Sequence, residues 1–153
     1  MEPVDDATAT IRPVEPRDTE GWRRMRARLW PEIEEDENVA ETDALSVDPR
    51  WSIIVAEDGD ELIGFVEAHL RDYAEGCDST PVGFLEGWYV EPEARLTGVG
   101  RALVAAAEAW AGEQGCSEMA SDAEIENEEG HRAHEAIGFE ETERLVCFRK
   151  ALT

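Results

Sequence analysis

Hydrophobic and polar positions along the chain follow two periods, and this mixture predicts a protein of helices and strands. Short apolar or alternating runs between turn residues predict strands, and apolar residues at three- and four-residue steps predict helices. We expect strands at 10–14, 51–57, 61–71, 82–90, 116–121 and 141–149. We expect helices from Asp18 or Thr19 to Leu29 and at 32–45, 98–114 and 127–137.

The order of these elements, β-α-α-β-β-β-α-β-α-β, predicts an α/β (α+β) protein in which crossover connections follow an antiparallel meander. Residues 58–60, Asp-Gly-Asp, supply a hairpin turn between the second and third strands. Gly83 and Gly87 inside the strand at 82–90 indicate a β-bulge or a close backbone approach by a ligand. No repeat or flexible linker divides the chain, so we expect a single domain over residues 10–153 after a loose acidic leader at 1–9.

Charge narrows the classes of partner. The chain has 37 acidic and 14 basic residues, a net charge of −23, and only one lysine, Lys150. This balance disfavours nucleic acids and anionic membranes as partners. Uniform acidity keeps a protein hydrated in concentrated salt, so we expect a halophilic protein; the alternative is an ordinary acidic protein with a cationic partner. Neither a long apolar run nor a signal-peptide pattern is present, which predicts a cytoplasmic location.

The cysteines and histidines do not indicate a metal. Cys77, Cys116 and Cys147 are odd in number and far apart, which disfavours a disulfide framework and a zinc site. The three histidines also lack the spacing of metal ligands. We therefore expect the cysteines to be small apolar residues and the protein to hold no metal.

The segment at 95–100, Arg-Leu-Thr-Gly-Val-Gly, carries the strongest chemical signal. It lies between the strand at 82–90 and the start of the helix at 98–114. Glycines there let the backbone approach a ligand, and a helix N-terminus presents unpaired N–H groups to a pyrophosphate. Arg95 and Arg101 add positive charge. The segment lacks the Walker and dinucleotide-fold patterns, and on these residues alone a tight turn explains the glycines equally well.

Together with the strand before it, this loop resembles the acetyl-CoA loop of the GNAT N-acetyltransferases. LWPE at 29–32, GCDSTPVGFLEGWYV at 76–90 and the segment 118–150 resemble more specifically the aminoglycoside 6′-N-acetyltransferases. The resemblance covers about Ile11 to Lys150. It implies a mostly antiparallel sheet of about six strands with about four helices on its faces.

The activity that the resemblance implies is acetyl transfer from acetyl-CoA, the donor substrate, to a primary amine of a cationic molecule. An aminoglycoside 6′-amine is the acceptor of that branch, where resistance to these antibiotics is the role. Related enzymes are often homodimers, so we expect a homodimer. The alternatives are another amine (a polyamine, an amino sugar or a protein N-terminus) and a non-catalytic acyl-CoA-binding module.

The resemblance also implies where acetyl-CoA binds. The residues along that strand end and loop are Trp88, Tyr89, Val90, Arg95, Leu96, Thr97, Gly98, Val99, Gly100 and Arg101. Backbone N–H groups of residues 88–90 would polarise the acetyl carbonyl if Gly87 marks a bulge that leaves them free. Asn127 matches a position that contacts coenzyme A, and a helix N-cap is its compatible alternative role.

A polycationic acceptor requires an acidic pocket, because carboxylates pair with ammonium groups and accept protons. By match with the family, the substrate-binding residues are Trp30, Tyr73, Glu86, Asp122 and Glu143. The two aromatic rings would flank a sugar ring. Glu86 and Asp122 are the candidate general bases, with Asp122 first because it falls at the C-terminal end of a strand. In so acidic a chain, a solvated surface carboxylate is the alternative for each.

His134 is the candidate general acid. Many GNAT enzymes have a tyrosine at this position that protonates the leaving thiolate, and a histidine can do the same near neutral pH. The alternative is a helix-surface histidine that is bonded to a neighbour.

Overall fold

The computed structural model describes residues 9–153, and its centre is a five-stranded sheet in the order β1-β2-β3-β4-β5. The strands are β1 (Thr10–Pro13), β2 (Trp51–Asp58), β3 (Glu61–Arg71), β4 (Val82–Val90) and β5 (Met119–Ser121). Neighbouring strands are antiparallel except for β4 and β5, which are parallel. The sheet therefore combines the predicted meander with one crossover connection.

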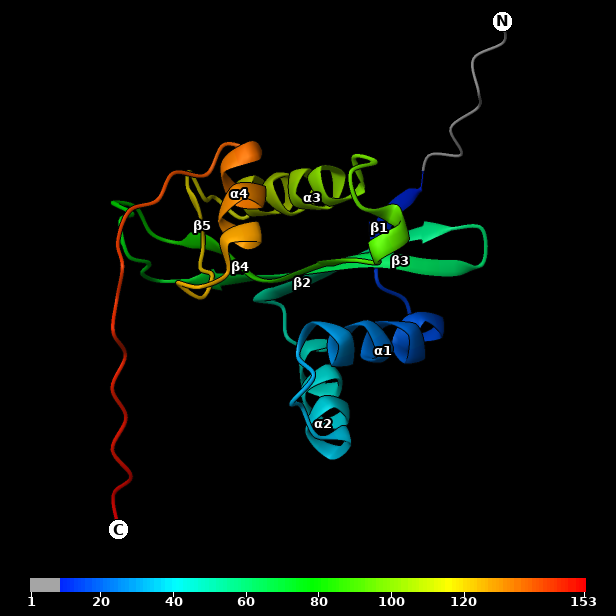
Figure 1. The fold of residues 1–153 in the computed structure, drawn as a ribbon, viewed down its shortest axis with the longest axis horizontal. Helices are drawn as coiled ribbons and strands as arrows, with labels where there is room; N and C mark the ends of the chain where they lie inside the picture. The colour runs from blue at the N-terminus through cyan, green and yellow to red at the C-terminus, as the bar shows by residue number, and fades with distance from the viewer. Residues whose placement is uncertain (1–8) are drawn as a thin grey trace, which may run out of the picture.

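Helices cover both faces of the sheet. The α-helices are α1 (Thr19–Leu29), α2 (Glu35–Leu45), α3 (Val99–Glu113) and α4 (Glu128–Ala136), and the 3₁₀ turns are η1 (Pro16–Asp18) and η2 (Pro92–Ala94). Figure 1 shows α3 and α4 on one face and α1 and α2 on the other. Because successive strand residues point to opposite faces, each face has a core of its own. Val66 packs in the core under α3, whereas its neighbour Phe65 packs with Trp22 of α1.

A β-bulge in β4 confirms the expectation raised by its glycines. In the pairing of β3 with β4, Glu67 faces Gly87 and the next residue, Ala68, faces Leu85, so Glu86 is an extra residue. An extra residue breaks the alternation of side chains at that point. Glu86 therefore contacts His69, on the same face of the sheet where the Cα of Gly87 lies against Trp30.

The parallel strands β4 and β5 separate after a short stretch. Their pairing extends only from Gly83 and Met119 to Leu85 and Ser121. Beyond it, β4 continues to Val90, and no strand within residues 9–153 pairs with that edge. The backbone groups along this edge are therefore available to a ligand.

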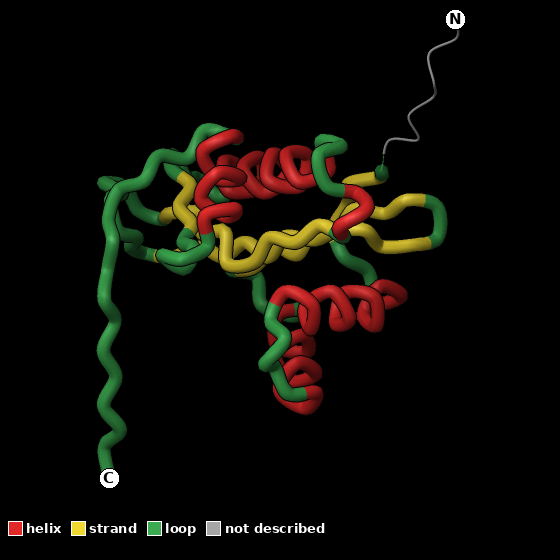
Figure 2. Tube along the Cα trace, in the orientation of Figure 1, coloured by secondary structure: helices red, strands yellow, loops and turns green. Residues whose placement is uncertain are grey.

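The predicted order of elements is confirmed as far as α4, and the predicted strand at 141–149 is wrong. This segment is extended and exposed, and it leaves the body of the protein (Figures 1 and 2). A strand needs a neighbouring strand for its backbone hydrogen bonds, and no other part of the described chain supplies one here. The sheet therefore has five strands rather than six.

Other bounds differ from the predictions by three residues or fewer. The second helix begins at Glu35 instead of residue 32, and β5 begins at Met119 instead of residue 116. The predicted leader lies outside the described residues apart from Ala9, which packs against the core. Among residues 9–153, no helix has the length and apolar character needed to cross a membrane.

An ion pair joins β1 to the start of α1. Arg12 donates hydrogen bonds of 2.7 and 2.9 Å to the two carboxylate oxygens of Asp18, which also accepts the backbone N–H of Glu15 at 2.7 Å. Asp18 is buried, and the hydrogen bonds from Arg12 lower its pKa below the ordinary value. Its contribution to stability is therefore present above about pH 4 and is lost as the pH falls through the lowered pKa.

We expect Asp18→Asn to lower the free energy of unfolding by about 1–3 kcal/mol at pH 7, because hydrogen bonds to a charged partner are lost. The difference from wild type should shrink at pH 3, below the ordinary pKa of an aspartate, because the unfolded wild-type chain then binds a proton that the folded carboxylate resists. Denaturant unfolding at the two pH values measures both effects. Asp43→Asn is the matched control, since Asp43 pairs with Arg23 at an exposed position. A difference of equal size at both pH values would contradict the argument.

Candidate functional site

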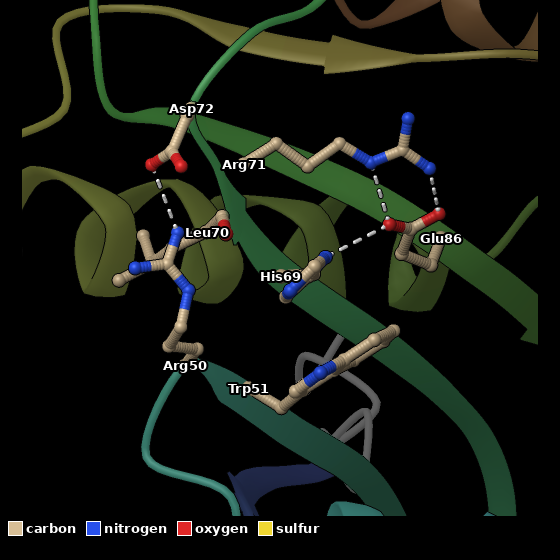
Figure 3. A pocket seen from close by; sticks show the side chains of 7 residues that line it. All are labelled: Arg50, Trp51, His69, Leu70, Arg71, Asp72 and Glu86. Atoms are coloured by element: carbon tan, nitrogen blue, oxygen red, sulfur yellow. Dashed lines mark hydrogen bonds and ion pairs between the residues drawn. The ribbon is translucent and has the colours of Figure 1, made fainter.

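A cleft lies between the α1–α2 connection and the sheet. It has a volume of about 650 Å³ and is lined by Arg26, Trp30, Glu32, Ile33, Glu37, Glu41, Ala44, Leu45, Trp51, Glu67 and Glu86. Five of these residues are glutamates and only one is basic. An adjoining hollow shares Trp51 and Glu86 with the cleft and extends toward the ends of β2 and β3 (Figure 3). The combined surface is suited to a ligand with several positive charges.

Glu86 lies where the cleft and the hollow meet, and two side chains hold its carboxylate in place. Arg71 donates hydrogen bonds of 2.9 and 2.7 Å from Nε and Nη2 to the two carboxylate oxygens. His69 Nδ1 lies 3.2 Å from the same carboxylate, and its ring stacks on Trp51 with 4.2 Å between centroids (Figure 3). The Arg71 guanidinium lies 3.5 Å from the centroid of the Phe84 ring. Glu86 is therefore oriented before any substrate arrives.

A buried pair forms the floor of the cleft. Arg26 Nε donates a hydrogen bond of 2.8 Å to Glu67, and Trp22 Nε1 donates one of 2.9 Å to the same carboxylate oxygen. Burial raises the pKa of Glu67, and the bonds from Arg26 and Trp22 act in the opposite direction. Arg26 also donates to Asn38 and Glu41 of α2 at 2.7 Å each. These bonds join α1 to α2 and so hold the wall of the cleft against the sheet.

Trp30 lies at the C-terminal end of α1 and reaches across to the bulge. A Cβ atom at Gly87 would lie only 2.8 Å from the Trp30 ring, so the glycine allows the indole to lie on the backbone of β4. The ring also contacts Phe65 edge-on at 6.4 Å between centroids, and the Arg26 guanidinium lies 5.0 Å from its centroid. The resemblance to the family placed Trp30 and Glu86 in one site, and the cleft contains both.

The other predicted substrate residues lie farther out. Asp122 directly follows β5, one residue beyond Ser121, whose pairing with Leu85 is the last between β4 and β5 before the two strands separate. Tyr73 is 65% exposed in the loop after β3, and Glu143 belongs to the exposed C-terminal segment. Neither of these two lines the cleft. Their roles, like that of Asp122 as general base, stay predictions.

The start of α3 has the form expected of an anion site. Gly98 has φ +92°, a left-handed conformation that favours glycine, and nothing lies within 4 Å of where its Cβ would be. The first helical hydrogen bond runs from Ala102 N–H to the Gly98 carbonyl, so the N–H groups of residues 99–101 have no acceptor within the helix. No side chain of the described residues caps this terminus.

Two arginines lie beside these amides. Arg95 Nε donates to the carbonyl of Val90 at 2.9 Å, and Arg101 donates to the carbonyl of Ala136 at 3.0 Å. The Arg101 guanidinium thus contacts a neutral carbonyl, whereas Arg95 Nη1 also lies 4.0 Å from the Glu129 carboxylate, an exposed and loose ion pair. Leu96 and Thr97 form an exposed turn between the two arginines, in which Leu96 has φ +63° and Thr97 donates its hydroxyl to the carbonyl of Ala94.

The end of β4, the strand before this loop, has main-chain groups available to a ligand, whereas the side chains of Trp88 and Tyr89 are packed against other parts of the protein. Trp88 lies on the α3 face, where a Cβ at Gly100 would be 3.3 Å from its ring. Tyr89 lies on the opposite face and donates its hydroxyl to Glu91 at 3.1 Å; burial raises the pKa of this tyrosine. The predicted contacts of residues 88–90 with acetyl-CoA would therefore come from main-chain groups.

Asn127 and His134 both make local bonds. Asn127 is the N-cap of α4 and accepts the Gly130 N–H at 3.0 Å, which confirms its predicted capping role. His134 Nδ1 lies 2.7 Å from the Gly130 carbonyl and Nε2 lies 2.8 Å from Ser121 Oγ. A carbonyl only accepts, so Nδ1 carries a hydrogen, and the single hydroxyl hydrogen of Ser121 has two possible acceptors, His134 Nε2 and the Leu85 carbonyl at 3.2 Å. The contacts match the helix-surface alternative, and the general-acid role stays a prediction.

Sequence reasoning missed the residues that support Glu86 and the cleft floor, namely Trp51, His69, Arg71, Glu67 and Arg26. One signal was present in β3, where polar residues at 67, 69 and 71 alternate with apolar ones at 66, 68 and 70. Residues at this spacing point to one face of the sheet. A polar row inside an otherwise apolar strand therefore indicates a functional face.

Known proteins that resemble this chain share most of its length. A profile of the acetyltransferase (GNAT) family matches residues 19–139. The aminoglycoside N(6′)-acetyltransferases type 1 of Stenotrophomonas maltophilia and Klebsiella aerogenes are 47% and 46% identical to it; the matches cover 94% and 96% of this chain, and 94% and 99% of theirs. The solved structure of AAC(6′)-Iy with the bisubstrate analogue CoA-S-monomethyl-acetylneamine has a TM-score of 0.91 and 39% identity, covering 94% of this chain and 99% of the other.

Proposed function

Because this chain belongs to the acetyltransferase (GNAT) family, we propose that it transfers the acetyl group of acetyl-CoA to the 6′-amine of an aminoglycoside. The observation that carries the proposal is the position of Glu86. It lies in an acidic cleft and beside the free edge of β4, which leads to the uncapped start of α3. An acceptor amine and an acetyl donor would therefore meet at one carboxylate.

The residues present fit acetyl-CoA. The N–H groups of Val99, Gly100 and Arg101, with the charges of Arg95 and Arg101, would hold the diphosphate. Acetyl-CoA supplies an acyl group that is activated by its thioester bond. Main-chain N–H groups on the free edge of β4, left unpaired by the bulge and the separation of β5, would stabilise negative charge on the acetyl oxygen.

The acidic cleft would orient the acceptor and accept its proton. Glu86 pairs with an ammonium group of the substrate, and the Trp30 ring lies against the apolar face of a sugar. In the reaction a bond forms between the amine nitrogen and the acetyl carbon, the carbon–sulfur bond breaks, and the amine loses a proton while the thiolate gains one. Asp122, at the opening between β4 and β5, is our first candidate for the proton acceptor, directly or through water, with Glu86 as the other candidate and His134 as the donor.

Paired acceptors test the proposal. Two aminoglycosides that differ only in carrying an amine or a hydroxyl at the 6′ position are incubated with acetyl-CoA, and release of the coenzyme A thiol is followed. We expect thiol release with the 6′-amine alone. Turnover of both compounds, or of other amines but neither of these, would overturn the regiochemistry. Coenzyme A binding without thiol release toward any amine would overturn the enzymatic activity.

The proposed setting is the cytoplasm of a halophile, where the enzyme acts as a homodimer and confers aminoglycoside resistance. The acidic composition with a single lysine supports the halophilic setting, and free cysteines suit a reducing compartment. In molar salt the Debye length is only about 3 Å, so long-range attraction of a cationic substrate is screened. The cleft carboxylates then determine recognition.

This predicts how the KM for a cationic acceptor depends on salt. We expect KM to rise as salt is first added, because the net charge of −23 no longer attracts the substrate over long distances, and to level off above about 1 M. Steady-state kinetics from low to molar salt measures the curve. A KM that continues to rise steeply above about 1 M would contradict recognition by direct contacts in the cleft.

A further inference from the structure

A carboxylate at the floor of the cleft has one oxygen without a partner. Glu67 is 2% exposed and lines the cleft. Its Oε2 atom accepts the hydrogen bonds from Trp22 Nε1 and Arg26 Nε, and Oε1 accepts none from residues 9–153. Oε1 is not sealed from the cleft, since the fully buried unpaired side-chain atoms of the described chain are Arg12 Nε and Trp88 Nε1. A buried carboxylate oxygen without a donor is unfavourable, so we expect a group in the cleft to bind it.

The charges around this oxygen favour a cation as its partner. Arg26 donates to Glu67 from Nε and to Asn38 and Glu41 from its two other nitrogens. One guanidinium therefore serves two carboxylates, and no other basic residue of the described chain lines the cleft. Hydrogen bonds between a cation and a carboxylate are about twice as strong as neutral ones. An ammonium group is thus a better partner for Oε1 than a neutral donor.

Glu67 lies next to Glu86 on one face of the sheet. In the pairing of β3 with β4, Glu67 faces Gly87, and Glu86 is the residue before that glycine. Paired Cα atoms are about 4.5–5.5 Å apart, and one residue along a strand adds at most about 3.8 Å. Glu67 bonds to Trp22 of α1, so it points to the same face as Glu86. The two carboxylates are therefore close enough to contact one sugar ring beside the Trp30 indole, which lies on Gly87.

We propose that Glu67 Oε1 binds a second ammonium group of the acceptor, on the ring that carries the amine to be acetylated. The inference rests on the proposed function and adds a preference for acceptors with two amines on that ring. Glu86 orients one nitrogen and Glu67 orients the other. Two contacts fix the ring in an orientation that a single contact leaves free to rotate.

The alternative role of Glu67 is to hold Trp22 and Arg26, and the two roles have different consequences. The structural contacts use Oε2 alone. Their loss would weaken the binding of every acceptor, because the wall of the cleft depends on Arg26. Loss of the contact through Oε1 would weaken only the binding of acceptors that carry the second amine.

Paired ligands separate these roles. Two aminoglycosides both carry the 6′-amine and differ only in an amine or a hydroxyl at the 2′ position of the same ring. Their Kd values are measured by calorimetry with coenzyme A, which has no acetyl group to donate, in about 1 M salt, where long-range attraction is screened. We expect wild type to bind the 2′-amine compound about 10- to 100-fold more tightly, and Glu67→Gln to reduce this ratio to about threefold or less.

Asn38→Ala is the matched control. It also removes a partner of Arg26, but Asn38 is buried and does not line the cleft. We expect this variant to change both Kd values by a similar factor and to keep the wild-type ratio. Equal affinity of wild type for the two ligands, or an unchanged ratio in Glu67→Gln, would overturn the proposal. The same reduction of the ratio in both variants would also overturn it.

A crystal structure of the wild-type protein with coenzyme A and the 2′-amine compound gives a second readout, which does not depend on the stability of a variant. We expect a ligand nitrogen within about 3.2 Å of Glu67 Oε1. A water molecule at that place, with the ligand amines elsewhere, would contradict the proposal. Neither readout depends on acetyl transfer, so a failure of the proposed activity would be seen separately, as binding without thiol release.

Discussion

Replacing Glu86 with glutamine is expected to lower kcat/KM for a cationic acceptor by about 30- to 1000-fold, equivalent to about 2–4 kcal/mol, while coenzyme A affinity stays within about twofold. Glutamine keeps the size of the side chain but removes its charge. The substrate ammonium then loses its partner, and Arg71, which donates two hydrogen bonds to the carboxylate, is left as an unpaired cation in the adjoining hollow. Steady-state kinetics and coenzyme A calorimetry measure the two effects.

Two further variants show how Glu86 acts. Glu113→Gln makes the same change at an exposed position on α3 and should leave kcat/KM unchanged. Glu86→Gln combined with Arg71→Gln removes the unpaired cation as well. If Glu86 anchors the substrate, the double variant should have a lower KM than Glu86→Gln and the same kcat. If Glu86 is the general base, kcat of the double variant should stay as low as that of Glu86→Gln. A wild-type value of kcat/KM for Glu86→Gln alone would exclude Glu86 from both roles.

Replacing Gly98 with valine is expected to weaken coenzyme A binding by about tenfold or more. Gly98 has φ +92°, where a β-branched residue is strained, so the chain should leave this conformation and turn the amides of residues 99–101 away from the ligand. Calorimetry with coenzyme A measures the loss. Because the strain also destabilises the fold, affinity alone cannot separate a binding role from a structural one.

Gly115 provides the matched control for this strain. It also has φ +92°, nothing lies within 4 Å of its Cβ position, and it lies just beyond the opposite end of α3. We expect Gly115→Val to lower the free energy of unfolding by an amount similar to Gly98→Val and to leave coenzyme A affinity unchanged. Equal losses of affinity in the two variants would show that general destabilisation, rather than the helix start, is responsible.

The sequence predicted much of the candidate site, but it did so through two kinds of signal. The loop at 95–100 follows from glycines between a strand and a helix, and the bulge beside Gly87 follows from glycines inside a strand; both are local information. Trp30, Glu86 and Asp122 were identified by their match to the family, and no local pattern distinguished them from the many other acidic and aromatic residues. The supporting residues His69 and Arg71 were missed, because their role depends on which strand lies beside β3.

By itself, the sequence determined the order of helices and strands as far as α4, the position of the bulge, the glycine at the start of α3 and the acidic character of the surface. These depend on near neighbours along the chain, through backbone conformation, periodicity and charge. Only the tertiary structure decided that Arg71 and His69 hold Glu86, that Trp30 lies on Gly87, and that residues 141–149 lack a partner within their own chain. Contacts between distant segments and the pairing of strands arise when the chain is folded, and composition or spacing does not specify them.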